Sequence, residues 1–121
     1  MILVDTSVWV THLRDGSKHL ENQLIDGNVM CHPYIIGELA CGNIKNRKEI
    51  ISLLQALPTA PLIEFDEYLY FIEENQLHSK GIGFVDIHLL ASALLAQIKL
   101  WTDDKRLNLA ATDLGIQYQI K

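Results

Sequence analysis

Residues 84–97 read FVDIHLLASALLAQ, and this stretch decides how the rest of the chain has to fold. It is apolar almost all round a helix, with Asp86 as its single formal charge. A helix without a polar face is stable when other elements bury it on all sides. We therefore predict that residues 84–97 form the most buried helix of the protein.

Short apolar runs and helical stretches alternate along the rest of the chain. Ile2-Leu3-Val4 is typical of a buried strand, and so is Lys99-Leu100-Trp101-Thr102 after the central helix. The pattern predicts helices over 7–14, 18–26, 33–41, 46–57, 66–78 and 104–114, and further strands over 28–32, 61–63 and 116–120. This alternation favours one α/β domain over residues 1–121, an α/β/α sandwich with a mostly parallel central sheet.

Local signals set several of the predicted helix ends. Pro33 fits the first turn of a helix, and Gly42 is placed as its C-terminal stop. Pro58 ends the helix over 46–57, and Asp66 is placed as the N-cap of the helix over 66–78. These signals give the predicted order of elements definite boundaries.

Composition favours a soluble globular protein with a cytoplasmic location. The apolar fraction is 49% and charged residues make up 21%. No apolar run is long enough for a membrane span, and no basic region precedes the first apolar run, as a secretory signal would require. Cys31 and Cys41 lack Cys-x-x-Cys spacing, so we expect reduced, buried thiols, with zinc ligation as the alternative. The net charge of −5 argues against a nucleic-acid coat protein but does not exclude a nuclease.

Three carboxylates stand alone in apolar surroundings. Asp5 is the single side-chain acid or base in residues 1–13, as Glu38 is in 29–44 and Asp86 in 81–98, apart from histidine. A lone buried carboxylate is unfavourable by several kcal/mol unless it is paired or binds a cation. Asp103 and Asp104 follow another apolar strand, and ligands of open α/β sheets collect at such strand ends. The pattern indicates a metal-dependent enzyme that acts on phosphate esters.

Each acid also has a structural interpretation. Asp5 could accept hydrogen bonds from the backbone of the following helix, and Asp103 or Asp104 could cap the next one. Asp86 could interact favourably with the dipole at the start of its helix. A capping box that begins at Asp86 is not expected, because the residue three positions later is Leu89 rather than Glu or Gln. Glu38 is the hardest to explain structurally, because it shares a predicted inward face with Tyr34, Ile35 and Cys41. A structural role for all four acids together is less plausible than for any one.

Crowded carboxylates repel one another, and hard divalent cations such as Mg²⁺ or Mn²⁺ relieve that repulsion. Such an ion lowers the pKa of a bound water, orients it, and stabilises charge on a scissile phosphate. The sequence shows neither a Cys or His nucleophile arrangement nor a glycine-rich phosphate loop, since Gly81-x-Gly83 is too short. Metal-assisted hydrolysis is therefore the chemistry that the residues favour.

Taken together, these residues resemble the PIN-domain family, and most closely its VapC-type toxins from toxin–antitoxin pairs. The resemblance covers the whole chain. It rests on Asp5-Thr6-Ser7 after a strand, Glu38 in a helix, Asp86 at the head of an apolar helix, and Thr102-x-Asp104 after a strand. The most family-like segment runs from Gly81 through Asp86 into Leu89-Leu90-Ala91-Ser92-Ala93.

The resemblance implies an endoribonuclease that uses Mg²⁺ or Mn²⁺, with Asp5, Glu38, Asp86 and Asp104 as its acidic quartet. It further implies a hydroxyl from Ser7 that supports Asp5, with N-capping of the next helix as the alternative. Asp103 is then an accessory residue or a solvated bystander. A homodimer and a cognate antitoxin protein that blocks the site are implied as well.

Basic residues provide candidate contacts to RNA phosphates. Lys45, Arg47 and Lys48 follow the predicted Glu38 helix, and Lys80 precedes the glycine loop; for each, an ordinary solvated position is the favoured alternative. Trp9, Tyr34 and Trp101 are expected in the core rather than as platforms for base stacking, and no His receives a catalytic role.

Two other acidic α/β proteins compete with the nuclease interpretation. A haloacid dehalogenase-type phosphatase needs a second Asp two residues after the first, where this chain has Ser7. A receiver-like phosphoacceptor module needs an acidic pair and a lysine at a late strand end, whereas Lys99 precedes its strand. The choice among transfer, ribosomal and messenger RNA as substrate stays open.

Overall fold

Three short parallel strands form the centre of the protein. The computed structural model describes residues 1–120, in which β1 (Ile2–Val4) lies between β2 (Val29–Met30) and β3 (Lys99–Trp101). Ile2 is paired with Val29 on one side and with Lys99 on the other, and both pairings are parallel. The predicted parallel α/β architecture is confirmed, with a smaller sheet than expected.

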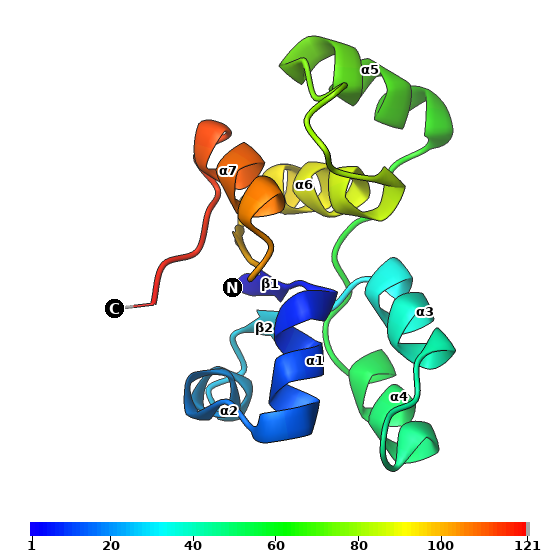
Figure 1. Ribbon diagram of the computed structural model, residues 1–121, viewed down its shortest axis with the longest axis vertical. Helices are drawn as coiled ribbons and strands as arrows, with labels where there is room; N and C mark the ends of the chain where they lie inside the picture. Colours follow the sequence, from blue (N-terminus) through cyan, green and yellow to red (C-terminus); the bar gives the residue numbers. More distant parts are fainter. Residues whose placement is uncertain (121) are drawn as a thin grey trace.

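Seven helices within residues 1–120 surround the strands. In Figure 1, α5 to α7 lie above the strands, and α1 to α4 lie beside or below them. The helices are α1 (Thr6–Asp15), α2 (Lys18–Ile25), α3 (Pro33–Cys41), α4 (Arg47–Gln55), α5 (Phe65–Asn75), α6 (Phe84–Ala96) and α7 (Lys105–Asp113). None of these helices is both long and apolar enough to cross a bilayer.

Helix α6 is the most buried helix, as its composition predicts. A continuous run from Ile87 to Ala93 is buried, and α6 packs against β3 and α5. Leu94 and Leu95 nevertheless remain exposed near its C-terminal end. The apolar character of α6 therefore serves the core over most of its length and leaves a short exposed apolar face.

The two predicted strands at 61–63 and 116–120 are wrong. Residues 61–63 form no strand pairing; the isolated bridge of this stretch joins Thr59 to Cys31, and Pro61 has no N–H with which to extend a ladder. The second pairs only through Gln117 with Leu100. Successive residues of a strand direct their backbone N–H and C=O groups to opposite edges of the sheet. In the three-residue β3, only Leu100 directs these groups toward residues 116–118, where it bonds to Ile116 and Tyr118.

Three other local predictions are corrected. Glu64, rather than Asp66, caps α5, and its backbone N–H donates to Glu67 Oε1 at 2.9 Å. The helix ends at Asn75, before the predicted His78, where Gln76 takes a left-handed conformation. Cys31 is buried, whereas Cys41 is exposed at the end of α3.

The burial of α6 makes a direct prediction about stability. Leu89→Ala removes a fully buried side chain and should lower the free energy of unfolding by about 3 kcal/mol. Leu95→Ala, a matched change on the exposed side of the same helix, should alter it by less than about 0.5 kcal/mol. Urea denaturation followed by circular dichroism measures both, and equal losses would contradict the assignment of α6 to the core.

Candidate active site

Asp5 is held at the carboxyl end of β1, the central strand. Its side chain is only 5% exposed, and its Oδ2 atom accepts hydrogen bonds from Ser7 Oγ at 2.8 Å and Thr102 Oγ1 at 2.7 Å. The side chain makes no capping hydrogen bond to α1, so that structural alternative is wrong. Two hydroxyl groups therefore fix this buried carboxyl group at the end of the sheet.

The same two hydroxyl groups organise the turn after β3. Ser7 Oγ accepts the backbone N–H of Asp103 at 3.0 Å, and Thr102 Oγ1 accepts that of Asp104 at 3.0 Å. Ser7 lies inside α1, so the N-cap interpretation of its side chain is wrong. Sequence reasoning missed Thr102 as a site residue, although the Thr102-x-Asp104 pattern carried the signal. The network ties the end of β1 to the end of β3.

Asp104 caps α7. Its Oδ1 atom accepts the backbone N–H of Leu107 at 3.0 Å, so the structural role weighed for this residue is present. This bond occupies one carboxylate oxygen. The side chains of Asp103 and Asp104 are both exposed.

Asp86 lies in the first turn of α6, and its Oδ2 atom accepts the backbone N–H of Gly83 at 3.1 Å. This is one half of a capping box in which Gly83 is the cap, so Asp86 caps no helix together with Leu89 but closes the box from the third position of α6. Burial raises the pKa of Asp86, and the charges of Asp5, Asp104 and Glu38 raise it further. The charges of three acids from other parts of the chain therefore act on Asp86 through space.

Glu38 lies on an exposed part of α3, where its Oε1 atom accepts a hydrogen bond from Thr6 Oγ1 at 2.7 Å. The predicted inward packing of its whole helix face is wrong. Ile35 is buried, but Glu38 and Cys41 are exposed because the groove between α3 and the start of α6 stays open. Thr6 is a second hydroxyl contact that the sequence did not reveal.

The donor set fits a hard divalent cation, because the four acids offer carboxylate oxygens and no sulfur or imidazole. The four carboxylates lie farther apart than the ligands of one bound ion would. Within residues 1–120, no three acidic, His or Cys side chains lie close enough to hold one ion as they stand. Glu38 and Asp104 are exposed and each has one oxygen in a hydrogen bond, whereas Asp5 is buried and bonded to two hydroxyl groups.

The predicted RNA-contact residues are exposed. Lys45, Arg47 and Lys48 lie at the start of α4 or just before it, and Lys80 lies before the glycine loop. Arg47 Nε donates to the carbonyl of Ala40 at 3.0 Å, so this side chain also supports the end of α3. Within residues 1–120, no hydrogen bond or ion pair joins these four to the acidic quartet.

The aromatic and histidine residues are divided between the core and the surface. Trp9 and Trp101 are buried as expected, whereas Tyr34 is partly exposed and stacks on Phe84. His32 and His88 are buried, and burial lowers the pKa of His32 to about 4 and lowers that of His88 as well. Both imidazoles are therefore uncharged at neutral pH.

The hydroxyl contacts to Asp5 predict a specific loss of stability. Thr102→Val removes a hydroxyl donor from a buried carboxyl group and should lower the free energy of unfolding by about 1–3 kcal/mol. Thr112→Val is the matched control, because its exposed hydroxyl donates only to the carbonyl of Asn108. Chemical denaturation distinguishes the two, and an equal effect at both positions would contradict the network.

The raised pKa of Asp86 predicts a dependence of stability on pH. A carboxyl group whose pKa is higher in the folded state stabilises the fold below its ordinary pKa, and this contribution is lost as the pH rises through the folded-state value. Asp86→Asn abolishes that loss while keeping an acceptor for Gly83. In buffer with chelator, the melting temperature of the variant should equal that of the wild type near pH 3 and exceed it at pH 7. Thermal unfolding of both proteins at the two pH values measures this difference. A variant less stable at pH 7 would contradict it.

Comparison with known proteins agrees with this geometry. The PIN domain model matches residues 2–113. The curated relative Ribonuclease VapC32 of Mycobacterium tuberculosis, from strain H37Rv and from strain CDC 1551, is 44% identical over 117 residues, covering 96% of this chain and 94% of the relative. The crystal structure of PAE2754 from Pyrobaculum aerophilum matches with a TM-score of 0.65 and 16% identity over 90% of this chain and 83% of that one, which shows a shared fold. The chain belongs to the PIN-domain family, among its VapC-type ribonucleases.

Proposed function

We propose that this protein is the toxin of a VapBC-type toxin–antitoxin pair, an endoribonuclease that hydrolyses RNA phosphodiester bonds with Mg²⁺ or Mn²⁺. The observation that carries the proposal is the buried carboxyl group of Asp5, which Ser7 and Thr102 fix at the end of the sheet. Burial raises the pKa of Asp86, and the charges of Asp5, Asp104 and Glu38 raise it further. Carboxylates gathered in this way favour a bound cation, which lowers the repulsion among them. Relatives that are named ribonucleases and are alike along almost their full length support the same activity.

The four acids would have different roles in binding the metal ion and orienting the attacking water. Asp5 serves as the central ligand, since Ser7 and Thr102 fix its carboxyl group. Asp86 and Asp104 complete the coordination, and Glu38 binds metal or orients the attacking water. The bound ion supplies an activated water and stabilises charge on the scissile phosphate.

Two supporting roles are proposed outside the quartet. Ser7 is a positioning residue, because it contacts Asp5 and the backbone of Asp103 but needs no contact with RNA. Exposed Lys45, Arg47, Lys48 and Lys80 would hold RNA phosphates without reading sequence. Asp103 stays an accessory residue in this proposal.

The activity implies three properties of the protein in the cell. An RNA substrate places it in the cytoplasm. A VapB-type antitoxin would block the acidic site, and a homodimer is the assembly that the family resemblance favours. A phosphatase of the haloacid dehalogenase type gains no support from the site, because Ser7 occupies the position of its second acid and donates to Asp5.

RNA cleavage tests the proposed activity directly. Purified protein, freed of any co-purifying antitoxin, should cut total bacterial RNA into discrete fragments when Mn²⁺ is present. Asp5→Asn should lower the cleavage rate at least about 100-fold, because it removes the proposed central ligand, and excess chelator should abolish cleavage by the wild type. Gel electrophoresis measures the cleavage rate, and sequencing of the fragment ends identifies the cleavage site.

An exposed acid elsewhere on the surface provides the control for that experiment. Asp15→Asn removes a carboxylate that pairs with Arg14, and it should leave the cleavage rate unchanged. Cleavage that persists in chelator, or that Asp5→Asn and Asp15→Asn affect equally, would contradict the assignment. Uptake of phosphate from a small phosphodonor without RNA cleavage would favour the receiver-like alternative instead.

A further inference from the structure

A shallow groove opens directly beside the acidic site. It lies between α3 and the first turn of α6 and has a volume of about 400 Å³. Glu38 lines both the groove and the acidic cluster, and the groove residue Val85 immediately precedes Asp86. Apart from Glu38, the main lining residues are uncharged: Tyr34, Gly37, Cys41, Phe84 and Val85. The groove is therefore continuous with the acidic site, but its lining is mostly apolar and aromatic rather than acidic.

An aromatic ring forms one wall of this groove and is held in a fixed position. Phe84 stacks against Tyr34 with ring centroids 6.0 Å apart and an interplanar angle of 26°. Buried Tyr68 and His88 contact the same ring, with centroids at 4.9 and 4.5 Å. Phe84 is nevertheless 50% exposed. A large apolar ring that its neighbours immobilise yet leave half uncovered is suited to contact with a ligand.

Glycine keeps the floor of the groove open. Gly37 lies inside α3, where glycine is less favourable than alanine, and its φ angle is not positive. A Cβ atom at this position would meet no atom within 4 Å. Neither backbone conformation nor packing therefore requires glycine here, and its effect is to leave space next to Phe84 and Glu38.

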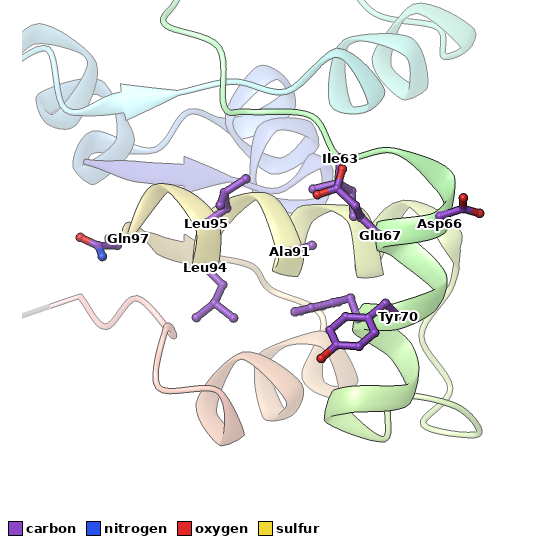
Figure 2. A pocket seen from close by; sticks show the side chains of 9 residues that line it. Ile63, Asp66, Glu67, Tyr70, Ala91, Leu94, Leu95 and Gln97 are labelled. Atoms are coloured by element: carbon purple, nitrogen blue, oxygen red, sulfur yellow. The ribbon is translucent and has the colours of Figure 1, made fainter.

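A different groove, between α5 and α6, is larger but carries no such argument. Figure 2 shows Tyr70, Leu94 and Leu95 among the side chains around it. None of the four acids of the quartet lines it, and nothing in the described structure indicates what would cover it. The groove beside Glu38 is distinguished by its continuity with the acidic site.

We propose that the groove formed by Tyr34, Gly37, Glu38, Cys41 and Phe84 receives one unpaired RNA base, stacked on Phe84, from a nucleotide next to the scissile phosphate. The inference rests on the proposed ribonuclease function. A phosphate bound through a metal ion at the quartet would lie next to Glu38, which also lines the groove with Phe84, so the neighbouring base would enter the groove. The apolar lining disfavours a second phosphate, whereas every base offers a π-face to an aromatic ring.

Substrates that lack one base test this contact. A short single-stranded RNA that contains the mapped cut would be compared with versions in which one nucleotide flanking the cut is abasic. Phe84→Ala should lower kcat/KM about tenfold on the intact RNA. At one flanking position, loss of the base should lower kcat/KM of the wild type by a similar factor. The same loss should leave kcat/KM of Phe84→Ala unchanged, because that variant has already lost the stacking contact. A purely structural role for Phe84 would not produce that dependence on a single base.

Three more variants separate stacking from folding. Phe84→Tyr keeps the ring and should retain cleavage, and Phe65→Ala, which removes an exposed ring on α5, should do so too. Gly37→Met should mimic Phe84→Ala by filling the groove, without lowering the melting temperature, because the space is open and methionine favours a helix.

The outcomes distinguish this inference from the function on which it rests. Independent penalties from Phe84→Ala and from every abasic position would overturn the stacking contact while RNA cleavage stands. Equal cleavage by wild type and Phe84→Ala would also overturn it and would leave the groove to a protein partner. Failure of the wild type to cut RNA at all would overturn the proposed function, and the base contact with it.

Discussion

The rest of the site depends on one buried carboxyl group at the end of the central strand. Asp5 is almost inaccessible to water, and the hydroxyl groups of Ser7 and Thr102 both donate to its Oδ2 atom. These contacts join the first turn of α1 to the turn after β3, which lie far apart in the sequence. A hydrophobic side chain would pack at this position without a network, so the polar arrangement serves something other than folding alone. It fixes the acidic site to the central strand of the sheet.

Repulsion among carboxylates is the second constraint on the structure. The charges around Asp86 raise its pKa, and burial has the larger effect in the same direction. Neutral donors hold the acids in place: Gly83 for Asp86, Thr6 for Glu38 and Leu107 for Asp104. Such a cluster lowers stability at neutral pH, and functional sites commonly hold this kind of unfavourable arrangement. Electrostatic attraction would draw a divalent cation to the cluster, whereas the neighbouring groove, in which Glu38 is the one charged lining residue, would offer RNA a largely uncharged surface.

How much the sequence alone predicts depends on the range of each signal. Lone charges in apolar runs indicated Asp5, Glu38 and Asp86 as candidate site residues, and helix composition predicted correctly that α6 is the most buried helix. Roles that depend on long-range pairing were missed: Thr6 and Thr102 are uncharged, and their partners lie 32 and 97 residues away. The segment 61–63 looks like a strand locally, but Pro61 lacks an N–H for a ladder. Exposure of Phe84 likewise follows from how α3 meets α6 rather than from its apolar neighbours in the sequence.

Calorimetric titration with Mn²⁺ tests the central claim most directly, namely that Asp5 anchors one cluster of metal-binding carboxylates. The wild type should bind Mn²⁺ saturably. In mildly acidic buffer it should release protons as it binds, because Asp86 has a raised pKa and ligands must be deprotonated. Asp5→Asn should bind at least about tenfold more weakly while remaining folded. Equal affinity in both proteins, or no binding by a folded wild type, would contradict the account.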